Sequence, residues 1–467
     1  MRPTHYDLVV IGSGQGGTPL AGAFARAGRR TALIERGHIG GTCINDGCTP
    51  TKTMVASARI AHLSRRAADY GVDGGVVRVD LARVRERKQQ MVTRFRSGSE
   101  RSLQRDGVEV IRGHARFVGD RRIEVTGGDT PTTLTADSIV INTGLRPATP
   151  RIEGLDDVPS LTSTSIMELA EVPTHLIVLG GGYVGLEFAQ MFRRFGSAVT
   201  ILQRATQLLP GEDADVAGEI EKILRADSIE VYLSADTTRI GRDANGVRLE
   251  YRKRPSSTVR TVSGSHLLVA AGRVPNTSDL DLGAAGVEVD ERGYIRVNER
   301  LETTTRGVFA IGDAKGGPAF THISYDDFRI LRTNLLHDGN ATTTGRIVPY
   351  TVFIDPQLGR VGMTQRAAEA AGLAVKVATY PLSKVARALE VDETQGFLKA
   401  VVDAESGKIL GAAVLGLEGG ELVTLLQIAM MGGLHYSALR DGVFSHPTLA
   451  ESLNNLFMSM DRPAQAV

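Results

Sequence analysis

The stretch YDLVVIGSGQGG, residues 6–17, joins an apolar run to a glycine-rich loop of the form Gly-x-Gly-x-x-Gly. The apolar run is typical of a short buried strand, and the residues after the loop predict a helix over 18–27 and a second strand over 31–34. In such a unit the glycines permit a tight turn, and the N-terminus of the helix faces a pyrophosphate. Glu35 ends the second strand, where an acid binds ribose hydroxyls, so Gly12, Gly14, Gly17 and Glu35 predict a dinucleotide-binding βαβ unit.

The same unit recurs later in the chain. A strand is expected over 176–179, a loop over 180–185, a helix over 186–195 and a further strand over 198–202. One glycine loop is weak evidence, but two loops that each lie between a strand and a helix indicate two dinucleotides. The residues expected to take part in this second site are Gly180, Gly182, Tyr183, Gly185 and Glu187.

The two copies differ at the position that selects the nucleotide. Glu35 follows Gly17 by 18 residues, whereas Gln203 occupies the same distance after Gly185 and is followed by Arg204. An acid at this position repels a 2′-phosphate and a guanidinium attracts one. Gln203 and Arg204 therefore predict NADPH at the second site, with NADH as the alternative.

Both cysteines of the chain lie in one short run, GGTCINDGCTPTK, residues 40–52. A zinc site needs about four ligands, and His38 is the only other candidate nearby, so a zinc site is not expected. An inert buried pair is the alternative, but packing is a poor explanation for two cysteines in a glycine-rich loop that follows a cofactor-binding strand. A redox pair of Cys43 and Cys48 that opens and closes as a disulfide is the favoured interpretation.

The sequence after the second cysteine is typical of a helix start. Pro50 suits the first turn, and the positive end of that helix would favour the Cys48 thiolate. Lys52 lies one turn further on and would reach the edge of the cofactor, with Glu187 as a buried partner. Gly41 and Thr42 are expected to contact the same cofactor.

A second candidate group lies near the C-terminus, in FSHPTLAE, residues 444–451. His446 is expected to lie just before the start of a helix, with Pro447 in its first turn and Glu451 one turn along. The carboxylate would hold the imidazole in one tautomer, as in other acid–histidine pairs. His446 is therefore a candidate proton carrier.

The remaining pattern predicts three domains and an α/β class. A strand closes on Gly312-Asp313, where an acid suits a hydroxyl-rich ligand chain, and Gly272-Arg273 marks the return from an inserted domain. After residue 347, strands over 351–354, 375–380, 397–403 and 409–415 alternate with helices over 364–371 and 420–432, which indicates an α+β domain. A long helix over 81–105 carries many arginines and is interpreted as a solvated face, and residues 461–467 as a frayed tail.

Composition sets limits on partners. The chain has 467 residues, a net charge of +1 and no apolar run long enough to span a membrane, so neither nucleic acid nor a membrane is expected as a partner. Only two cysteines and no signal peptide favour the cytoplasm.

These motifs together resemble the class I pyridine nucleotide–disulfide oxidoreductases over essentially the whole chain. The resemblance rests on residues 40–52, on Gly-Gly-Gly-Tyr-x-Gly-x-Glu over 180–187, on Gly312-Asp313 and on His446 with Glu451. It implies an FAD-binding domain over 1–149 and 273–346, an NAD(P)-binding domain over 150–272, and a dimerisation domain over 347–467. Thr143, Gly144, Gly272, Arg273 and Asp313 complete the expected cofactor contacts.

The resemblance also implies roles for the candidate residues. Cys48 would be the thiol nearest the flavin and Cys43 the thiol that exchanges with substrate, while Tyr183 would gate the flavin face. The chain would form a homodimer in which His446 and Glu451 complete the site of the other subunit.

The substrate remains open between several classes. The run Thr49 to Thr53 and the segment 443–457 resemble mercuric-reductase-like proteins, and within them a reactive-chlorine-resistance branch tied to copper and hypohalous oxidants. No further cysteine pair exists to pass on a soft metal ion, so a small-molecule disulfide or reactive oxidant is the main expectation. A reductase of Hg²⁺ or Cu²⁺ is the alternative, a dihydrolipoamide dehydrogenase is disfavoured by Gln203, and a flavin-binding redox-responsive protein has no support from a partner surface.

Overall fold

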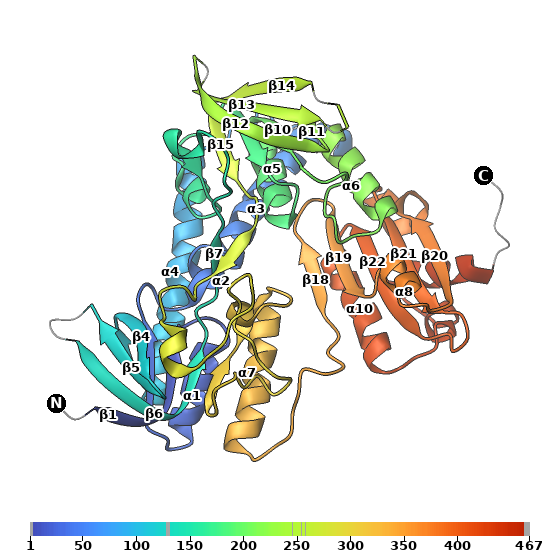
Figure 1. Ribbon diagram of the computed structural model, residues 1–467. Coiled ribbons are helices and arrows are strands. Elements are labelled where there is room, and N and C mark those ends of the chain that lie inside the picture. Colours follow the sequence, from blue (N-terminus) through green and yellow to red (C-terminus); the bar gives the residue numbers. More distant parts are fainter. Residues whose placement is uncertain (1–2, 128–130, 245, 254, 257, 462–467) are drawn as a thin grey trace. The chain divides into compact units, whose positions relative to one another are not determined.

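The computed structural model describes residues 3–127, 131–244, 246–253, 255–256 and 258–461, and its elements are labelled in Figure 1. They form two compact units. The first comprises Met1–Met54, Ala82–Ala148 and Gly272–Arg346; the second comprises Val55–Leu81, Thr149–Ala271 and Ile347–Val467. Helices and strands alternate through most of the chain, and the expected α/β class is confirmed.

The first unit is built on a seven-stranded sheet in the order β3-β2-β1-β6-β5-β4, with β17 also paired to β6. Its strands are β1 (Thr4–Ile11), β2 (Thr31–Glu35), β3 (Glu109–Arg112), β4 (His114–Gly119), β5 (Arg122–Thr126), β6 (Thr132–Ile141) and β17 (Val308–Ala310). Strands β3, β2, β1, β6 and β17 run parallel, whereas β4 and β5 form an antiparallel extension. Helix α1 (Gly17–Arg26) connects β1 to β2, so the first predicted βαβ unit is confirmed.

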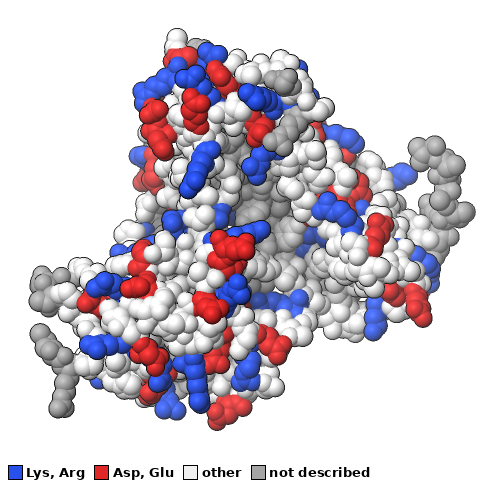
Figure 2. Space-filling model, viewed as in Figure 1, with Lys and Arg blue, Asp and Glu red and all other residues white. Residues whose placement is uncertain are grey.

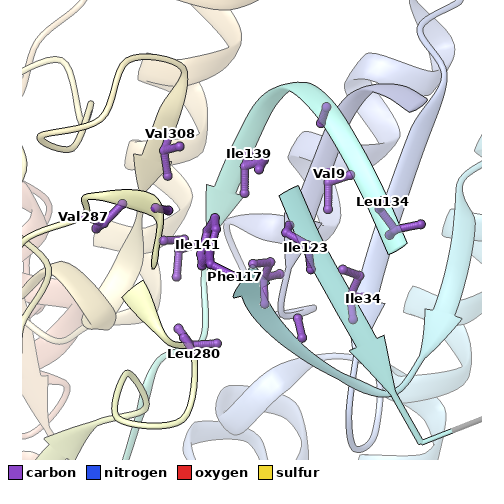
Figure 3. Close-up of a cluster of buried hydrophobic side chains, with 14 of the residues drawn as sticks. Val9, Ile34, Phe117, Ile123, Leu134, Ile139, Ile141, Leu280, Val287 and Val308 are labelled. Carbon is purple, nitrogen blue, oxygen red and sulfur yellow. The ribbon is translucent and has the colours of Figure 1, made fainter. Parts of the chain in front are cut away.

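Both faces of the parallel strands are buried, which explains why β1 reads as a continuous apolar run. On one face Val9, Ile34, Ile139 and Phe117 gather in a cluster drawn in Figure 3, and none of them is more than 1% exposed. On the other face the alternate side chains of the same strands pack against α1. The loops at the ends of these strands are thereby held on a rigid support.

The helices of the first unit carry the cysteine run. Its remaining α-helices are α2 (Gly41–Asn45), the first turns of α3 (Cys48–Arg65), α4 (Leu81–Asp106) and α7 (Thr321–Leu336). Helix α3 begins at Cys48 as predicted, and α4 confirms the expected long helix. A two-stranded sheet pairs β7 (Leu145–Pro147) with β16 (Arg273–Pro275), where the chain leaves this unit and returns to it. The domain boundaries given above stay predictions.

The second unit contains the second glycine loop. A parallel sheet has the order β11-β10-β9-β15-β8, and a separate antiparallel sheet has the order β12-β13-β14. The elements here are β8 (Ser160–Leu161), β9 (His175–Leu179), α5 (Tyr183–Phe195), β10 (Ala198–Leu202), α6 (Ala214–Ala226), β11 (Ile229–Tyr232), β12 (Ala235–Asp243), β13 (Gly246–Lys253), β14 (Val259–Gly264) and β15 (His266–Val269). The second βαβ unit is therefore confirmed, with α5 beginning three residues before the predicted start.

The C-terminal part of this unit is an antiparallel sheet in the order β18-β19-β22-β21-β20. Its elements are β18 (Pro349–Val352), β19 (Gln357–Gly362), α8 (Gln365–Ala370), β20 (Val375–Pro381), α9 (Ala386–Glu390), β21 (Phe397–Asp403), β22 (Ile409–Gly416), α10 (Gly419–Met431), α11 (Ser437–Arg440) and α12 (Ser452–Met458). One predicted strand had the wrong bounds here, and one strand was missed. The strand expected over 351–354 lies two residues earlier, and β19 was not expected at all.

A buried charge cluster ties α5 to the turn between β18 and β19. Arg194 pairs with Asp355, which also accepts from Arg59, and Arg194 lies 3.3 Å from Asp227. The side chains of Arg194 and Asp355 are only 7% and 11% exposed. All these residues belong to the second unit.

The visible surface mixes acidic and basic side chains (Figure 2). Among the described residues, none of the helices combines the length and the apolar character that a membrane span requires. Short 3-10 helices occur at Ala67–Tyr70, Leu155–Asp157, Ser165–Glu168, Leu282–Ala285, Gly312–Lys315, Leu382–Lys384 and Ser459–Asp461. The predicted tail over 461–467 lies, apart from Asp461, outside the described residues.

Candidate functional site

Both glycine loops lie between a strand and the N-terminus of a helix. At their last glycine the two loops make the same close approach: a Cβ on Gly17 would lie 2.4 Å from the carbonyl oxygen of Gly12, and one on Gly185 would lie 2.2 Å from that of Gly180. No side chain fits there, so each helix can start directly against its strand. A Cβ on Gly182 would meet nothing within 4 Å, so the backbone N–H groups of that turn stay open to a phosphate.

Glu35 lies beside the first glycine loop. Its Oε2 accepts hydrogen bonds from Ser13 N at 3.0 Å and from Ser13 Oγ at 2.6 Å, and its Oε1 accepts from Gly37 N at 2.7 Å. Ser13 Oγ in turn accepts from Gly40 N at 3.0 Å, which ties the cysteine run to the same loop. The carboxylate is therefore fixed at the end of β2, where the predicted ribose contact requires it.

Strands β6 and β17 are parallel neighbours, and the residues that follow their ends, Thr143 and Asp313, lie at the same edge of the sheet. Thr143 Oγ1 is buried without a hydrogen-bond partner, next to Gly144 with φ +66°. Burial raises the pKa of Asp313, against the lowering effect of Arg273 and Lys315. Buried polar groups are normally hydrogen-bonded, so this hydroxyl and this carboxyl are suited to bind the polar groups of a ligand. Together with the glycine loop and Glu35, they fit the predicted FAD.

The position of the Gly312-Asp313 turn depends on a residue that the sequence analysis missed. Asp327 on α7 is fully buried; its Oδ2 accepts from Gly312 N at 2.8 Å and its Oδ1 from Arg346 Nη2 at 2.8 Å. Asn142 was also missed: its Nδ2 donates to the carbonyl oxygen of Gly12 at 3.3 Å. Neither residue lies in a motif, so only the three-dimensional structure identifies them.

Cys43 and Cys48 are both thiols in the structure, and they lie close enough to interact. The pKa of Cys43 is raised well above its usual range, first by a hydrogen bond with the Cys48 side chain and then by burial. Thr321 and Lys52 act in the opposite direction. Cys43 therefore keeps its proton beside Cys48, and the two sulfurs have unequal roles.

Two helix N-termini meet at this thiol pair. Cys48 is the first residue of α3, and its Sγ lies 3.5 Å from Oγ1 of Thr321, the first residue of α7. The positive ends of both helices, together with the hydroxyl, stabilise negative charge on sulfur. The start of α3 was predicted, whereas nothing in the local sequence pointed to Thr321.

The second glycine loop presents the other predicted residues. Tyr183 begins α5 and is 38% exposed. Glu187, one turn further on, is buried, and its Oε1 accepts from Phe353 N at 2.8 Å. The predicted pairing of Glu187 with Lys52 joins residues of different units and stays a prediction.

Gln203 and Arg204 differ in what they can contact. Gln203 is buried; its Oε1 accepts from Gly181 N at 3.1 Å and its Nε2 donates to the carbonyl oxygen of Gln207 at 3.1 Å. Arg204 is exposed. Gln203 therefore stabilises the conformation of the loop through its hydrogen bonds. Arg204 carries an exposed positive charge that a 2′-phosphate could reach.

His446 and Glu451 form the expected acid–histidine pair. His446 Nδ1 lies 2.9 and 3.0 Å from the two carboxylate oxygens of Glu451. Because a carboxylate only accepts, Nδ1 carries the hydrogen and Nε2 is left as the basic nitrogen of an imidazole that is 71% exposed. The predicted helix start was wrong: α12 begins at Ser452, and the bond before Pro447 is cis.

Within the described residues, no three His, Cys, Asp or Glu side chains gather in a way that could hold a metal ion. The thiol pair lies in the first unit and the His446–Glu451 pair in the second. The assignment of each side chain to a cofactor or substrate stays a prediction.

Known proteins match this chain over nearly its whole length. The family model of the pyridine nucleotide-disulphide oxidoreductases matches residues 6–327, and the dimerisation domain of the same family matches residues 348–457. The probable pyridine nucleotide-disulfide oxidoreductase RclA of Escherichia coli is 40% identical over 97% of this chain and 98% of its own length. A mercuric reductase of Bacillus cereus is 34% identical over 98% of this chain and 72% of its own length.

A solved structure gives the same result. The Cu(II) complex of the HOCl-induced flavoprotein disulfide reductase RclA from E. coli matches with a TM-score of 0.88 and 39% identity, over 98% of this chain and 99% of that one. The two glycine loops, the thiol pair and the C-terminal sheet thus occur together in a chain that belongs to the pyridine nucleotide-disulphide oxidoreductases.

Proposed function

We propose that this enzyme passes electron pairs from NADPH through a Cys43–Cys48 disulfide to a small disulfide or a reactive oxidant. The observation that carries the proposal is the thiol pair at the start of α3, with Thr321 3.5 Å from Cys48 Sγ and the pKa of Cys43 raised first by its hydrogen bond with Cys48. Cys48 lies where a thiolate is stabilised. Cys43 keeps its proton until it reacts with the substrate disulfide. Such a division suits a dithiol that must open and close repeatedly.

The family is FAD-dependent and uses NAD(P)H. In this chain Gly12, Gly14, Glu35, Thr143 and Asp313 would hold the FAD. When bound, the flavin supplies two-electron transfer between the nicotinamide and the thiol pair.

The thiol chemistry balances as a disulfide exchange. His446 Nε2 would take the proton of Cys43, and the Cys43 thiolate then attacks one sulfur of a substrate R–S–S–R and releases one RS⁻, which takes up the proton from His446. Cys48 then attacks Cys43 in the mixed disulfide and releases the second thiolate. The substrate gains two electrons and two protons, and Cys43 and Cys48 are left as a disulfide.

His446 would supply the protons. Its Nε2 is directed away from Glu451, which holds the ring in the tautomer a proton carrier needs. We propose that it acts in the other subunit of a homodimer. Helix α10 supports a dimer because Leu425, Ile428 and Met431 form an exposed apolar stripe, 39%, 60% and 69% exposed, in the matched dimerisation domain.

Arg204 supports NADPH as the electron donor. It is exposed and follows the residue that replaces the acid of NAD sites. Expression in the cytoplasm, expected from the two cysteines, remains a prediction.

A one-equivalent reduction separates the two thiol roles. Anaerobic addition of one equivalent of NADPH should give a long-wavelength charge-transfer band in the wild type. Cys43→Ser has no disulfide to reduce, so it should show the band already in the oxidised enzyme, and Cys48→Ser should show no band in either state. Both variants should lose turnover of disulfide substrates. Equal bands in the two variants would contradict the assigned roles.

A metal ion is the second candidate substrate. It is favoured by the names of two relatives, the mercuric reductase of B. cereus and the Cu(II) complex of the E. coli flavoprotein. Steady-state NADPH oxidation should be compared for glutathione disulfide, other disulfides, hypothiocyanite, Hg²⁺ and Cu²⁺. Turnover with a disulfide or oxidant and none above background with either ion would reject the metal. A dihydrolipoyl dehydrogenase of Geobacillus stearothermophilus is also similar, at 32% identity, so NAD⁺ reduction by dihydrolipoamide should be measured as a separate assay.

A further inference from the structure

The loop after β10, residues 203–213, carries Arg204 and is attached to the second glycine loop at its start. Gly181 N donates to Gln203 Oε1 at 3.1 Å, and Leu209 N donates to the carbonyl oxygen of Gly181 at 3.0 Å. Gln207 Nε2 closes the loop on itself by donating to the carbonyl oxygen of Glu212 at 3.0 Å. The backbone around Arg204 is therefore fixed at several points.

The other end of this loop is held by the C-terminal sheet. Glu212 Oε2 accepts from Arg360 Nε of β19 at 3.0 Å, and Glu212 Oε1 accepts from Tyr350 OH of β18. Arg360 is fixed as well, because its Nη1 donates to the carbonyl oxygens of Val361 at 2.8 Å and Ala412 at 2.7 Å. We call Glu212, Tyr350 and Arg360 the loop clamp.

Asp213 adds a second attachment next to the clamp. Its carboxylate accepts from Gln365 N at 3.0 Å and from Arg366 N at 3.1 Å, and it pairs with Lys399 Nζ at 3.1 Å. Burial alone would raise the pKa of Asp213, but these hydrogen bonds and the Lys399 charge outweigh it and lower the pKa. The loop thus ends in two consecutive acids that are both bound to the C-terminal sheet region.

The clamp lies in the interior. The side chains of Glu212 and Arg360 are only 2% and 4% exposed. A buried ion pair of this kind adds little net stability, because desolvation offsets the attraction, and its best-attested use is to specify one arrangement. Here the arrangement that it specifies is the path of the loop that carries Arg204.

We propose that Glu212, Tyr350 and Arg360 are positioning residues for the adenosine half of the nucleotide, so that the C-terminal sheet helps to determine nucleotide affinity and preference. They touch no substrate; they act through Arg204. The inference rests on the proposed binding of NADPH at the second glycine loop.

The test is a double-mutant cycle on nucleotide affinity. Dissociation constants for NADP⁺ and NAD⁺ are measured by calorimetry on purified holoenzyme for Glu212→Gln, Tyr350→Phe, Arg204→Ala and the two combined variants with Arg204→Ala. Glu212→Gln and Tyr350→Phe should weaken NADP⁺ binding several-fold and NAD⁺ binding much less. In the Arg204→Ala background the same changes should have almost no effect on NADP⁺.

Asp215→Asn is the matched control. Asp215 pairs with Lys399 at 2.7 Å in the same region but lies in the first turn of α6, outside the loop, and its side chain is 44% exposed. It should leave both dissociation constants unchanged. Clamp variants that weaken NADP⁺ equally with and without Arg204, or that do not weaken it at all, would overturn the inference.

If the proposed NADPH site is wrong, the dissociation constants of the variants should change in a different way. If Arg204→Ala alone leaves NADP⁺ affinity unchanged, the assignment of the 2′-phosphate to Arg204 is wrong. Selective loss of NADP⁺ affinity in the Arg204 variant with no effect of the clamp variants would reject the clamp alone.

Discussion

Thr321→Val should make the Cys48 thiol less acidic. The substitution isolates the contribution of the Thr321 hydroxyl to that acidity. The hydroxyl of Thr321 lies 3.5 Å from Cys48 Sγ, and it also lowers the pKa of Cys43 against the raising effects of the Cys48 hydrogen bond and of burial. Removing it takes one donor from the thiolate and leaves both helix N-termini in place. A larger fraction of Cys48 should therefore be protonated at any given pH.

The magnitude follows from the interactions involved. A hydrogen bond to a charged group contributes about 1.5–3 kcal/mol, whereas a helix N-terminus contributes about 0.3–1 kcal/mol at exposed positions. The 3.5 Å contact is long enough that the lower end of the first range applies. We therefore expect about a tenfold loss of thiolate at a pH where most of the thiol is protonated.

The assay uses the fact that the chain has only two cysteines. In a Cys43→Ser background Cys48 is the sole thiol, so the rate of alkylation by iodoacetamide as a function of pH reports its ionisation alone. Thr321→Val should shift that profile to higher pH, and Thr321→Ser, which keeps the hydroxyl, should not. Identical profiles for the Val and Ser variants would refute the role given to the hydroxyl and leave the helix ends as the explanation.

Three further outcomes are expected. Glu451→Gln should lower turnover of disulfide substrates by about tenfold or more, because the imidazole loses its fixed tautomer, while thiol reduction by NADPH stays fast; equal loss in both half-reactions would contradict this. Asp213 has a lowered pKa, so it stabilises the fold above its unfolded value of about 3.9 and the stabilisation is lost as pH falls through the native value; Asp213→Asn should flatten the acid limb of stability measured by urea unfolding. Asp355→Asn should cost about 3 kcal/mol of unfolding free energy, because the buried Arg194 loses one of its two carboxylate partners and keeps only Asp227 at 3.3 Å, and Asp355→Asn with Arg194→Met should cost less than the single change.

Much of the site could be predicted because its chemistry is local in sequence. The glycine loops, the start of α3 at Cys48 and the pairing of His446 with Glu451 each involve residues within a few positions of one another. Short-range backbone geometry, helix capping and side-chain reach decide such features. The fold class followed in the same way from two repeated strand–loop–helix patterns.

The parts that could not be predicted depend on contacts between distant segments. Thr321 reaches Cys48 across 273 positions, and Glu212 reaches Arg360 across 148. Strand β19 was not predicted either, because its sequence QLGRVG contains two glycines and has a weak preference for strands. Its Gly359 is required by packing: a Cβ there would lie 2.0 Å from the carbonyl oxygen of Gly419 at the start of α10.

The thiol pair and the acid–histidine pair lie in different units, which allows the proposed dimer to be tested. The groups that make Cys43 and Cys48 unequal all lie in the first unit, whereas His446 lies in the second, within the matched dimerisation domain. If His446 serves the other subunit, a monomer keeps the reduction of the thiol pair by NADPH and loses turnover of substrate. Ile428→Glu places a charge in the exposed apolar stripe of α10 and should produce that monomer, as measured by analytical ultracentrifugation, with fast thiol reduction and slow turnover in stopped-flow and steady-state assays. A monomer that turns over at the wild-type rate would show that the histidine acts within its own chain.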